Sequence, residues 1–352
     1  MAVSIRQLAA ATGLSVATVS HALRQSGRMA ARTRRKVLRA AERLGYRANR
    51  PLAKALALAR KPPEYRETLA VITEYARDEE PEWQREMTRL VEQYATRLGF
   101  KVEVHALTTG RRVAHERLGR VLFQRGVRGL IVLPRLRRRV ARLLLDWDKF
   151  AAVELGRSLS LPTGLHKVDR PVYYEMLEVL HHLKRAGYQR VGLAVHPAES
   201  AYRKQCYTAA WLAAHAGLGE RRRRPQVGLE GVLWRWQRGE FGRWMREYRP
   251  DVLLVQELRE LLQWLTEEGW RVPEDVSVFA MSRRDPWFDG FNKDARGLAE
   301  ACVDMVAQLL ERNELGLPAR PRVWMVQDEL MAGHSLRLPL KRGGVGTQSS
   351  KP

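Results

Sequence analysis

Residues 14–23 read "LSVATVSHAL", and this short stretch decides the fold of the amino-terminal part of the chain. Ser15 is a suitable N-cap for a helix that continues to about residue 24. At 100° per residue, one arc of that helix is centred on Val19 and Leu23, which predicts that this arc packs in a core. The small residues at the helix start would let its backbone approach another surface closely. The opposite, exposed arc carries Val16, Ala17, Ser20, His21 and Arg24.

Two further helices are predicted on either side of this stretch. Residues 4–13, "SIRQLAAATG", predict a first helix that ends at Gly13 and presents Leu8 and Ala9 to the apolar arc. A third helix is expected over residues 32–44. Two helices joined by a tight turn and braced by a third form a helix-turn-helix unit, although a generic three-helix bundle with a basic surface has the same outline. In the third helix the inward residues would be Val37, Ala40, Ala41 and Leu44, and the mostly outward ones Arg34, Arg35, Arg39 and Arg43.

Positive charge is concentrated in the same region. The 352-residue chain has a formal net charge of +23, and residues 1–61 contain fourteen Lys and Arg side chains but a single acid, Glu42. A local excess of this size is expected of a surface that binds a polyanion. A general preference for arginine is the alternative explanation, because further arginine runs occur at 135–142 and 221–224. We interpret those two runs as solvated surface.

The order and spacing of these elements resemble the headpiece of the LacI/GalR family of bacterial transcriptional repressors. The matching stretches are "LAAATGLSVATVSHAL", "TRRKVLRAAERLGY" and "PLAKAL". The resemblance implies a hinge helix within residues 50–65, of which Leu56 or Leu52 would enter the DNA minor groove; an ordinary linker helix is the alternative. It also implies that the DNA-binding residues are Ser15, Val16, Ala17, Thr18, Ser20 and His21 at the major groove, with Arg24, Met29, Thr33, Tyr46 and Asn49 on the backbone and nearby bases.

From residue 66 onward, short apolar runs alternate with amphipathic segments. Runs of continuous Val, Ile and Leu are typical of parallel strands covered by helices on both faces, so the alternation predicts α/β lobes at about 66–162 and 168–285. The segment up to residue 335 would cross between the lobes, and the basic tail 336–352 is expected to be disordered. The expected strands are 69–75, 101–107, 127–133, 150–155, 190–195, 251–256 and 276–281, and the expected helices are 82–98, 113–124, 138–145, 172–186, 199–216 and 295–313.

This second region resembles the sensor half of the same family, most sharply at residues 181–281, which implies the fold of periplasmic sugar-binding proteins. The fold class is therefore an all-α helix-turn-helix headpiece (1–49), a hinge and linker (50–65), and an α/β two-lobed periplasmic-binding-protein-like sensor (66–335). Ligands of such folds bind at the carboxyl ends of strands. Ser282 stands where many family members have aspartate, which indicates an atypical effector or a degenerate site. The strand ends predict Tyr75, Arg77, His196, Ser282 and Arg283 as effector-binding residues, and the resemblance adds Arg203.

Other features restrict the class of protein. Only two cysteines occur, Cys206 and Cys302, so we expect neither a disulfide framework nor a structural zinc site. A phosphate-binding loop, a nucleophile elbow and a zinc-protease helix are all absent from the sequence, so we predict no enzyme and no cofactor. With no candidate membrane span or signal peptide, the chain is expected in the cytoplasm, associated with the nucleoid. Four tryptophans have two possible roles, which are stacking on a sugar ring and packing in the core. They are Trp211, Trp234, Trp236 and Trp244.

Together these features predict a homodimeric transcription regulator. It would act as a repressor, bind a near-palindromic operator in double-stranded DNA, and respond to a small-molecule effector, most simply a carbohydrate. Two alternatives stay open at this point: a DNA-tethered enzyme that handles carbohydrates or nucleosides, and a nonspecific DNA-binding protein.

Overall fold

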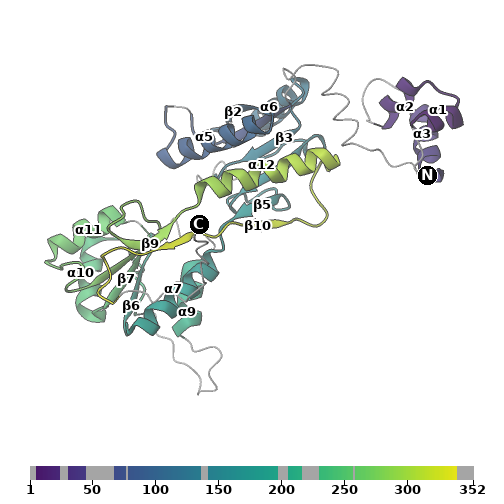
Figure 1. Cartoon of the computed structure of the whole chain (residues 1–352). Coiled ribbons are helices and arrows are strands. Elements are labelled where there is room, and N and C mark those ends of the chain that lie inside the picture. The colour runs from purple at the N-terminus through teal and green to yellow at the C-terminus, as the bar shows by residue number, and fades with distance from the viewer. Residues whose placement is uncertain are drawn as a thin grey trace, which may run out of the picture. The chain divides into compact units, whose positions relative to one another are not determined.

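The computed structural model describes residues 5–23, 31–44, 67–76, 78–135, 142–196, 205–215, 230–256 and 258–338. The contacts within the chain divide it into two compact units, Met1–Tyr65 and Arg66–Pro352, each described here by itself (Figure 1). Several predicted features lie outside the described residues: the hinge segment 50–65, Arg24, Met29, Tyr46, Asn49, Arg77 and Arg203.

The first unit contains three helices: α1 (Ile5–Thr12), α2 (Val16–Leu23) and α3 (Ala31–Arg43). Their shared core contains Leu8, Val19 and Val37, each with no exposed surface. The small residues Ala9, Ala22, Ala40 and Ala41 complete this core and allow the helices to approach one another closely. The helix-turn-helix prediction is thereby confirmed, with Val19 on the buried arc of α2 as expected.

The turn between α1 and α2 has the chemistry that its sequence predicts. Gly13 adopts a left-handed φ of 63°, a conformation that glycine reaches without a steric penalty. The N–H of Leu14 donates to the carbonyl of Ala9 at 3.2 Å and closes the end of α1. Ser15 caps α2, because its Oγ accepts a hydrogen bond from the N–H of Thr18 at 3.1 Å.

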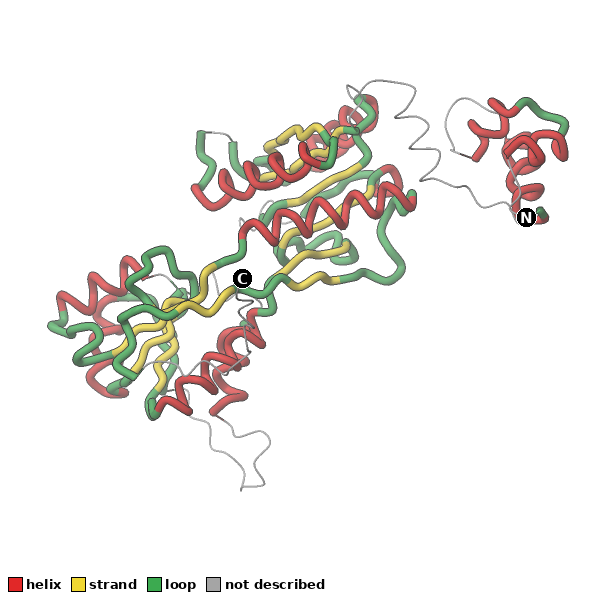
Figure 2. Tube along the Cα trace, in the orientation of Figure 1, coloured by secondary structure: helices red, strands yellow, loops and turns green. Residues whose placement is uncertain are grey.

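The amino-terminal lobe of the second unit is built on a six-stranded parallel sheet in the order β10-β5-β4-β3-β1-β2 (Figures 1 and 2). Helices α5 (Glu82–Arg97) and α12 (Ala295–Arg312) bury their apolar faces in the core on one side of this sheet, and α6 (Arg112–Gln124) covers the other. The strands are β1 (Thr68–Thr73), β2 (Lys101–Ala106), β3 (Gly129–Val132), β4 (Ala151–Leu155), β5 (His166–Asp169) and β10 (Val323–Met325).

The carboxy-terminal lobe has a five-stranded sheet in the order β11-β9-β8-β7-β6, in which β11 pairs antiparallel with β9. Helices α7 (Val172–Ala186) and α9 (Cys206–His215) pack in one core, and α10 (Arg238–Tyr248) and α11 (Leu258–Glu267) pack in the other. The strands are β6 (Val191–Ala194), β7 (Val252–Val255), β8 (Ser277–Ala280), β9 (Asp289–Asn292) and β11 (Glu329–Met331).

The structure corrects several details of the sequence prediction. Strands β5 ("HKVD") and β9 ("DGFN") were not predicted, because polar residues interrupt them. Their positions move the lobe boundaries, since β5 belongs to the first sheet and β9 extends the second lobe beyond residue 285. The helix expected at 138–145 is wrong for residues 142–145, which are not helical.

The predicted disordered tail also begins too early. Leu336 is buried, and the N–H of Leu338 donates to the hydroxyl of Tyr188 at 2.9 Å. The backbone N–H of Arg337 donates to Ser277 Oγ at 3.1 Å. Residues 336–338 therefore belong to the carboxy-terminal lobe. Among the described residues, no helix is both long and apolar enough to span a membrane.

Candidate DNA-binding surface and effector site

Helix α2 exposes its first residue to solvent, while residues further along the helix fill the headpiece core. Val16, at the start of the helix, is 43% exposed, whereas Val19 and Ala22 are fully buried. Thr18 is half-buried, and its Oγ1 lies 2.8 Å from the hydroxyl of Ser15. The capping hydroxyls therefore organise the start of α2. Three further predicted contact residues belong to α2, but the structure does not describe their side chains. They are Ala17, Ser20 and His21.

Helix α3 adds a basic surface to the same unit. Val37, Ala40 and Ala41 face the core, so the charged residues between them are displaced outward. Arg34 and the predicted contact residue Thr33 are half-buried, so Arg34 lies less far outward than expected. Cations on an exposed face of this kind attract a phosphate backbone by releasing counterions. The exposed basic side chains of α3 are Arg32, Arg35, Lys36, Arg39 and Arg43.

A buried guanidinium lies at the carboxyl ends of the first strands of the amino-terminal lobe. Arg135, only 1% exposed, donates from Nη1 to the carbonyl of Thr73 at 3.2 Å and from Nη2 to that of Leu107 at 2.7 Å. Burial lowers the pKa of Arg135 to about 10, and the negative charge of buried Glu74 opposes that shift. The predicted effector residue Tyr75 follows Glu74 and is half-buried, and its N–H donates to Thr73 Oγ1 at 3.2 Å. Arg135 thus ties the ends of three strands together, so the interpretation of the run 135–142 as solvated surface is wrong for its first residue.

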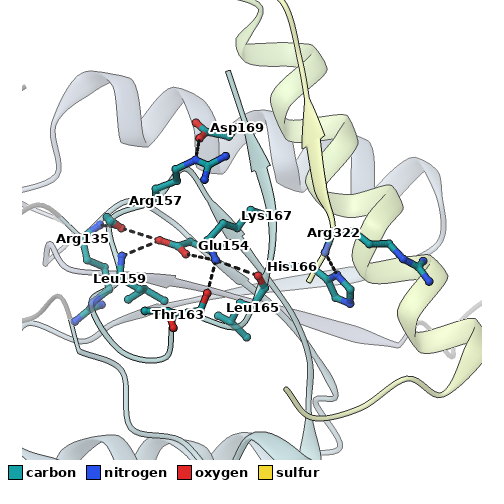
Figure 3. A network of polar contacts seen from close by, with 11 residues as sticks. Arg135, Glu154, Arg157, Leu159, Thr163, Leu165, His166, Lys167, Asp169 and Arg322 are labelled. Carbon is teal, nitrogen blue, oxygen red and sulfur yellow. Dashed lines mark hydrogen bonds and ion pairs between the residues drawn. The ribbon is translucent and has the colours of Figure 1, made fainter. Parts of the chain in front are cut away.

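Glu154 is the centre of a second buried network, shown in Figure 3. Its Oε1 accepts a hydrogen bond from the N–H of Leu159 at 2.7 Å, and its Oε2 lies 3.4 Å from Nζ of Lys167. Lys167 Nζ also donates to the carbonyls of Thr163 and Leu165 at 2.9 and 3.0 Å. Burial raises the pKa of the Glu154 carboxyl, and these donors partly oppose that shift. The network holds the loop after β4 against β5.

His166 joins β5 to the segment that precedes β10. Its Nδ1 accepts a hydrogen bond from the backbone N–H of Arg322 at 3.0 Å (Figure 3). Burial, and next the positive charge of Arg322, lower the pKa of His166. The neutral form of the His166 side chain therefore stabilises the fold more than the protonated form does.

This shift predicts how stability depends on pH. Because the folded pKa of His166 lies below its unfolded value of about 6.5, the contribution to stability is complete above that pH. It is lost as the pH falls below about 6.5 and through the folded pKa. We expect His166→Asn, which keeps an acceptor without the titration, to lose less stability than wild type between pH 7.5 and 5.0. Urea denaturation at the two pH values measures this, and an equal loss in both proteins would contradict it.

Aromatic side chains gather near the carboxyl end of β6 in the other lobe. A parallel bridge between Leu193 and Val232 places residues 231–233 alongside this strand, directly before Trp234 and Trp236. The rings of His196 and Trp236 meet edge to face with centroids 5.7 Å apart, and Trp234 is 56% exposed. The predicted residue His196 thus has Trp236 as an aromatic neighbour, and the exposed Trp234 is a ring on which a sugar could stack. The other two tryptophans pack instead, with Trp211 buried in the core and Trp244 partly buried.

The loop after β8 contains the remaining predicted effector residues. Ser282 is half-buried. Arg283 donates from Nη1 to the carbonyls of Phe288 and Ala332 at 3.1 and 2.9 Å, so its guanidinium stabilises the loop itself. The next residue, Arg284, reaches across to the other lobe and lies 2.9 Å from the carboxylate of Glu82.

A hollow of about 600 Å³ occurs away from these strand ends, between α5 and α12. It is lined by both positive and negative side chains, among them Arg97 and Glu300, which form an ion pair at 3.1 Å. Nothing in the sequence predicts this hollow. Among the described residues, no group of three His, Cys, Asp or Glu side chains could hold a metal ion.

The effector site at the strand ends stays a prediction, and the sequence analysis did not identify the buried charged residues that the structure has there. Glu74 directly follows β1, Arg135 lies three residues beyond the end of β3, and Glu154 lies inside β4. A charged residue next to a continuous apolar run is the signal that could have identified them. Trp234 was noted, but its exposure depends on the bridge to β6, which the sequence does not reveal.

Two family models match the chain. Residues 4–49 match the model described as bacterial regulatory proteins, lacI family, and residues 180–336 match the model of a periplasmic binding protein-like domain. The search of curated proteins gave no match.

Solved structures share the fold over nearly the whole chain. The transcriptional regulator CelR–cellobiose complex is 22% identical, with a TM-score of 0.55 over 95% of this chain and 99% of that one. The lac repressor dimer bound to operator and the anti-inducer ONPF is 19% identical, with a TM-score of 0.54 and the same coverage. The transcription regulator CcpA of Lactococcus lactis is 14% identical, with a TM-score of 0.55 over 78% of this chain and 100% of that one.

The family matches fall on the two parts that the structure itself distinguishes. The lacI-family match covers all three headpiece helices, and the periplasmic-binding-protein-like match covers most of the carboxy-terminal lobe. The chain therefore belongs to the lacI family of bacterial regulatory proteins and is a DNA-binding transcriptional regulator, not an enzyme, with a periplasmic-binding-protein-like effector domain.

Proposed function

We propose that this regulator is a sequence-specific repressor that binds a near-palindromic operator as a homodimer. The observation that carries the proposal is the contrast between the exposed start of α2 and its buried residues. Val19 and Ala22 fill the core, while Val16 at the helix start is exposed, so the start of the helix can enter a major groove. The basic surface of α3 supplies the sequence-independent attraction to phosphates.

The bases would be read from the start and the exposed side of α2. Val16 and Ala17 suit contact with thymine methyl groups, and Ser20 and His21 suit hydrogen bonds to base edges. Ser15 and Thr18 would support the helix start, and Thr33 would contact the backbone. The predicted roles of Arg24, Met29, Tyr46, Asn49 and Leu56 complete the proposed interface.

The effector is proposed to be a carbohydrate that binds at the strand ends of the two lobes. The candidate residues remain Tyr75, Arg77, His196, Arg203, Ser282 and Arg283. Trp234 joins them because it is exposed two residues before Trp236, whose ring meets His196, and an aromatic face suits the apolar face of a sugar ring. Support also comes from the structural neighbour solved with cellobiose, to which this chain is similar in fold.

Dimerisation is supported by an apolar surface on the amino-terminal lobe. Strand β2 is an edge strand, and its Val104 is 47% exposed. Helix α6 exposes Val113 at 72% and Val121 at 38%. Exposed apolar residues on neighbouring elements are typical of a protein interface. A structural neighbour was solved as a dimer on its operator. The proposed dimer would act in the bacterial cytoplasm, at the nucleoid.

The recognition role of α2 can be tested by substitution. We expect His21→Ala to reduce discrimination between the selected operator and single-base variants by about 1–3 kcal/mol at the positions that it reads. Arg39→Ala is the matched control, because loss of an exposed cation should weaken binding to all sequences alike. Fluorescence anisotropy with labelled duplexes at fixed salt measures both.

Two outcomes would contradict the proposal. If His21→Ala lowers affinity but leaves discrimination unchanged, α2 is not the reading helix. If wild-type protein binds random and selected duplexes equally at physiological salt, the chain is a nonspecific DNA-binding protein.

A further inference from the structure

The two lobes of the second unit are joined by three crossover segments in the described part of the chain: residues 170–171, 293–294 and 326–328. The first connects β5 to α7, the second connects β9 to α12, and the third connects β10 to β11 (Figure 1). In each case one of the two elements packs in the amino-terminal lobe and the other in the carboxy-terminal lobe. Any change in the angle between the lobes must therefore be absorbed by these segments.

Asp328, in the third crossover, contacts the other two. Its Oδ1 accepts a hydrogen bond from the backbone N–H of Asp294, in the second crossover, at 3.2 Å. Its Oδ2 pairs with the guanidinium of Arg170, in the first crossover. A single carboxylate therefore links all three crossover segments.

The cluster is completed by Glu175 in the first turn of α7. The N–H of Asp328 donates to Glu175 Oε1 at 2.9 Å, and Arg170 Nη2 lies 3.3 Å from Glu175 Oε2. The side chains of Arg170, Asp328 and Glu175 are only 5%, 0% and 2% exposed. Because water is excluded, pulling one charge away from the others is strongly unfavourable. The crossover segments must therefore move as one body around this cluster or lose its interactions.

Another ion pair that joins the lobes in the described part of the chain is of a different kind. Arg284 and Glu82 meet at 2.9 Å, but their side chains are 74% and 76% exposed. Exposed pairs contribute little because solvent and salt screen them. The buried cluster, rather than this surface pair, should therefore dominate the relative orientation of the lobes.

We propose that Asp328 is a positioning residue that fixes the angle between the two lobes. Its hydrogen-bond and ion-pair partners are Asp294, Arg170 and Glu175, so it acts through the crossover segments. With the carboxylate in place, the lobes keep one orientation until a ligand supplies enough differential binding energy to change it. Its effect on gene control rests on the proposed function, because lobe orientation matters there only if it alters operator affinity.

The lobe angle can be measured without DNA. Spin labels are placed on the full chain at Arg120→Cys in α6 and Arg259→Cys in α11, both exposed, in a Cys206→Ala background; Cys302 is fully buried. Electron–electron double resonance then gives the distribution of distances between the lobes. We expect Asp328→Asn to give a broader distribution than wild type, because the neutral amide no longer balances the charge of Arg170.

The matched control is Asp275→Asn. Asp275 also pairs with an arginine, with Arg271 Nε 2.9 Å from its carboxylate, but this pair lies at the surface and away from the crossovers. We expect this variant to keep the wild-type distribution. If Asp328→Asn and Asp275→Asn both match wild type, the proposal is wrong.

A second variant covers the case in which Asp328→Asn does not fold. Arg170→Lys keeps the positive charge but lacks the planar fork that can pair with Asp328 and Glu175 at once. We expect Arg170→Lys to broaden the distribution of distances between the lobes as well. If this variant folds and keeps the wild-type distribution, the proposal is wrong.

Operator binding provides the second measurement. If loosened lobes populate the DNA-competent orientation less often, Asp328→Asn should weaken binding to the duplex selected by the wild type by roughly 5- to 150-fold. Wild-type affinity despite a broadened distribution would show that the lobe angle is not transmitted to DNA. Failure of the wild type to select any duplex would refute the proposed function, while the distance measurement would still decide the role of Asp328.

Discussion

Replacing Arg135 by methionine is expected to destabilise the amino-terminal lobe by about 3–5 kcal/mol, the usual result of leaving a buried charge without its partner. The guanidinium donates to the carbonyls of Thr73 and Leu107 and faces buried Glu74. Methionine replaces the aliphatic stem of arginine but has no guanidinium and no donor. Both carbonyls would lose a partner, and Glu74 would lose the opposite charge nearby.

Urea denaturation followed by tryptophan fluorescence measures this effect. All ten tryptophans lie at or beyond Trp83, so the signal comes from the second unit alone. Arg271→Met is the matched control, because Arg271 is exposed and its partner Asp275 stays solvated. We expect little change in that control. Equal losses in the two variants would show that Arg135 is not a structural cation.

The second large effect is expected in the headpiece. Leu8 is fully buried against Val19 and Val37, and Leu8→Ala in such a core typically costs about 2–5 kcal/mol. A three-helix unit of this size rarely has more stability than that. We therefore expect the headpiece to unfold and DNA binding to disappear, while the tryptophan-reported stability of the sensor stays unchanged.

The same substitution at Leu38 provides the control. Leu38 lies in α3 but is 43% exposed, so Leu38→Ala should leave the headpiece folded. Hydrogen exchange of headpiece peptides and anisotropy with labelled duplex DNA distinguish the two variants. If Leu8→Ala retains protected amides and wild-type DNA affinity, the described core is wrong.

Much of the fold could be predicted because its signals are local. In α2, the spacing of Val19 and Ala22 fixes the buried arc, and Gly13 and Ser15 mark the turn. Strands β1, β3 and β7 are continuous apolar runs, which only a sheet buried on both faces explains. Strands β5 and β9 have no such signal, because their place in a sheet depends on neighbours that are distant in sequence.

The site was predictable only in outline. The rule that ligands bind at strand ends locates Tyr75, His196 and Ser282, but it does not show which side chains are already committed to the fold. Arg283 illustrates the difference, since its guanidinium binds two carbonyls of its own lobe. The contacts of Asp328 likewise depend on three crossovers that meet only in the folded chain.

Selection of bound duplexes from a random DNA pool by the full-length protein tests the central claim most directly. We expect enrichment of one motif with two-fold symmetry, because two identical headpieces would each read a half-site. We also expect that Leu8→Ala enriches nothing. Recovery of an unchanged random pool by folded wild-type protein at physiological salt would contradict the claim that this headpiece reads DNA sequence.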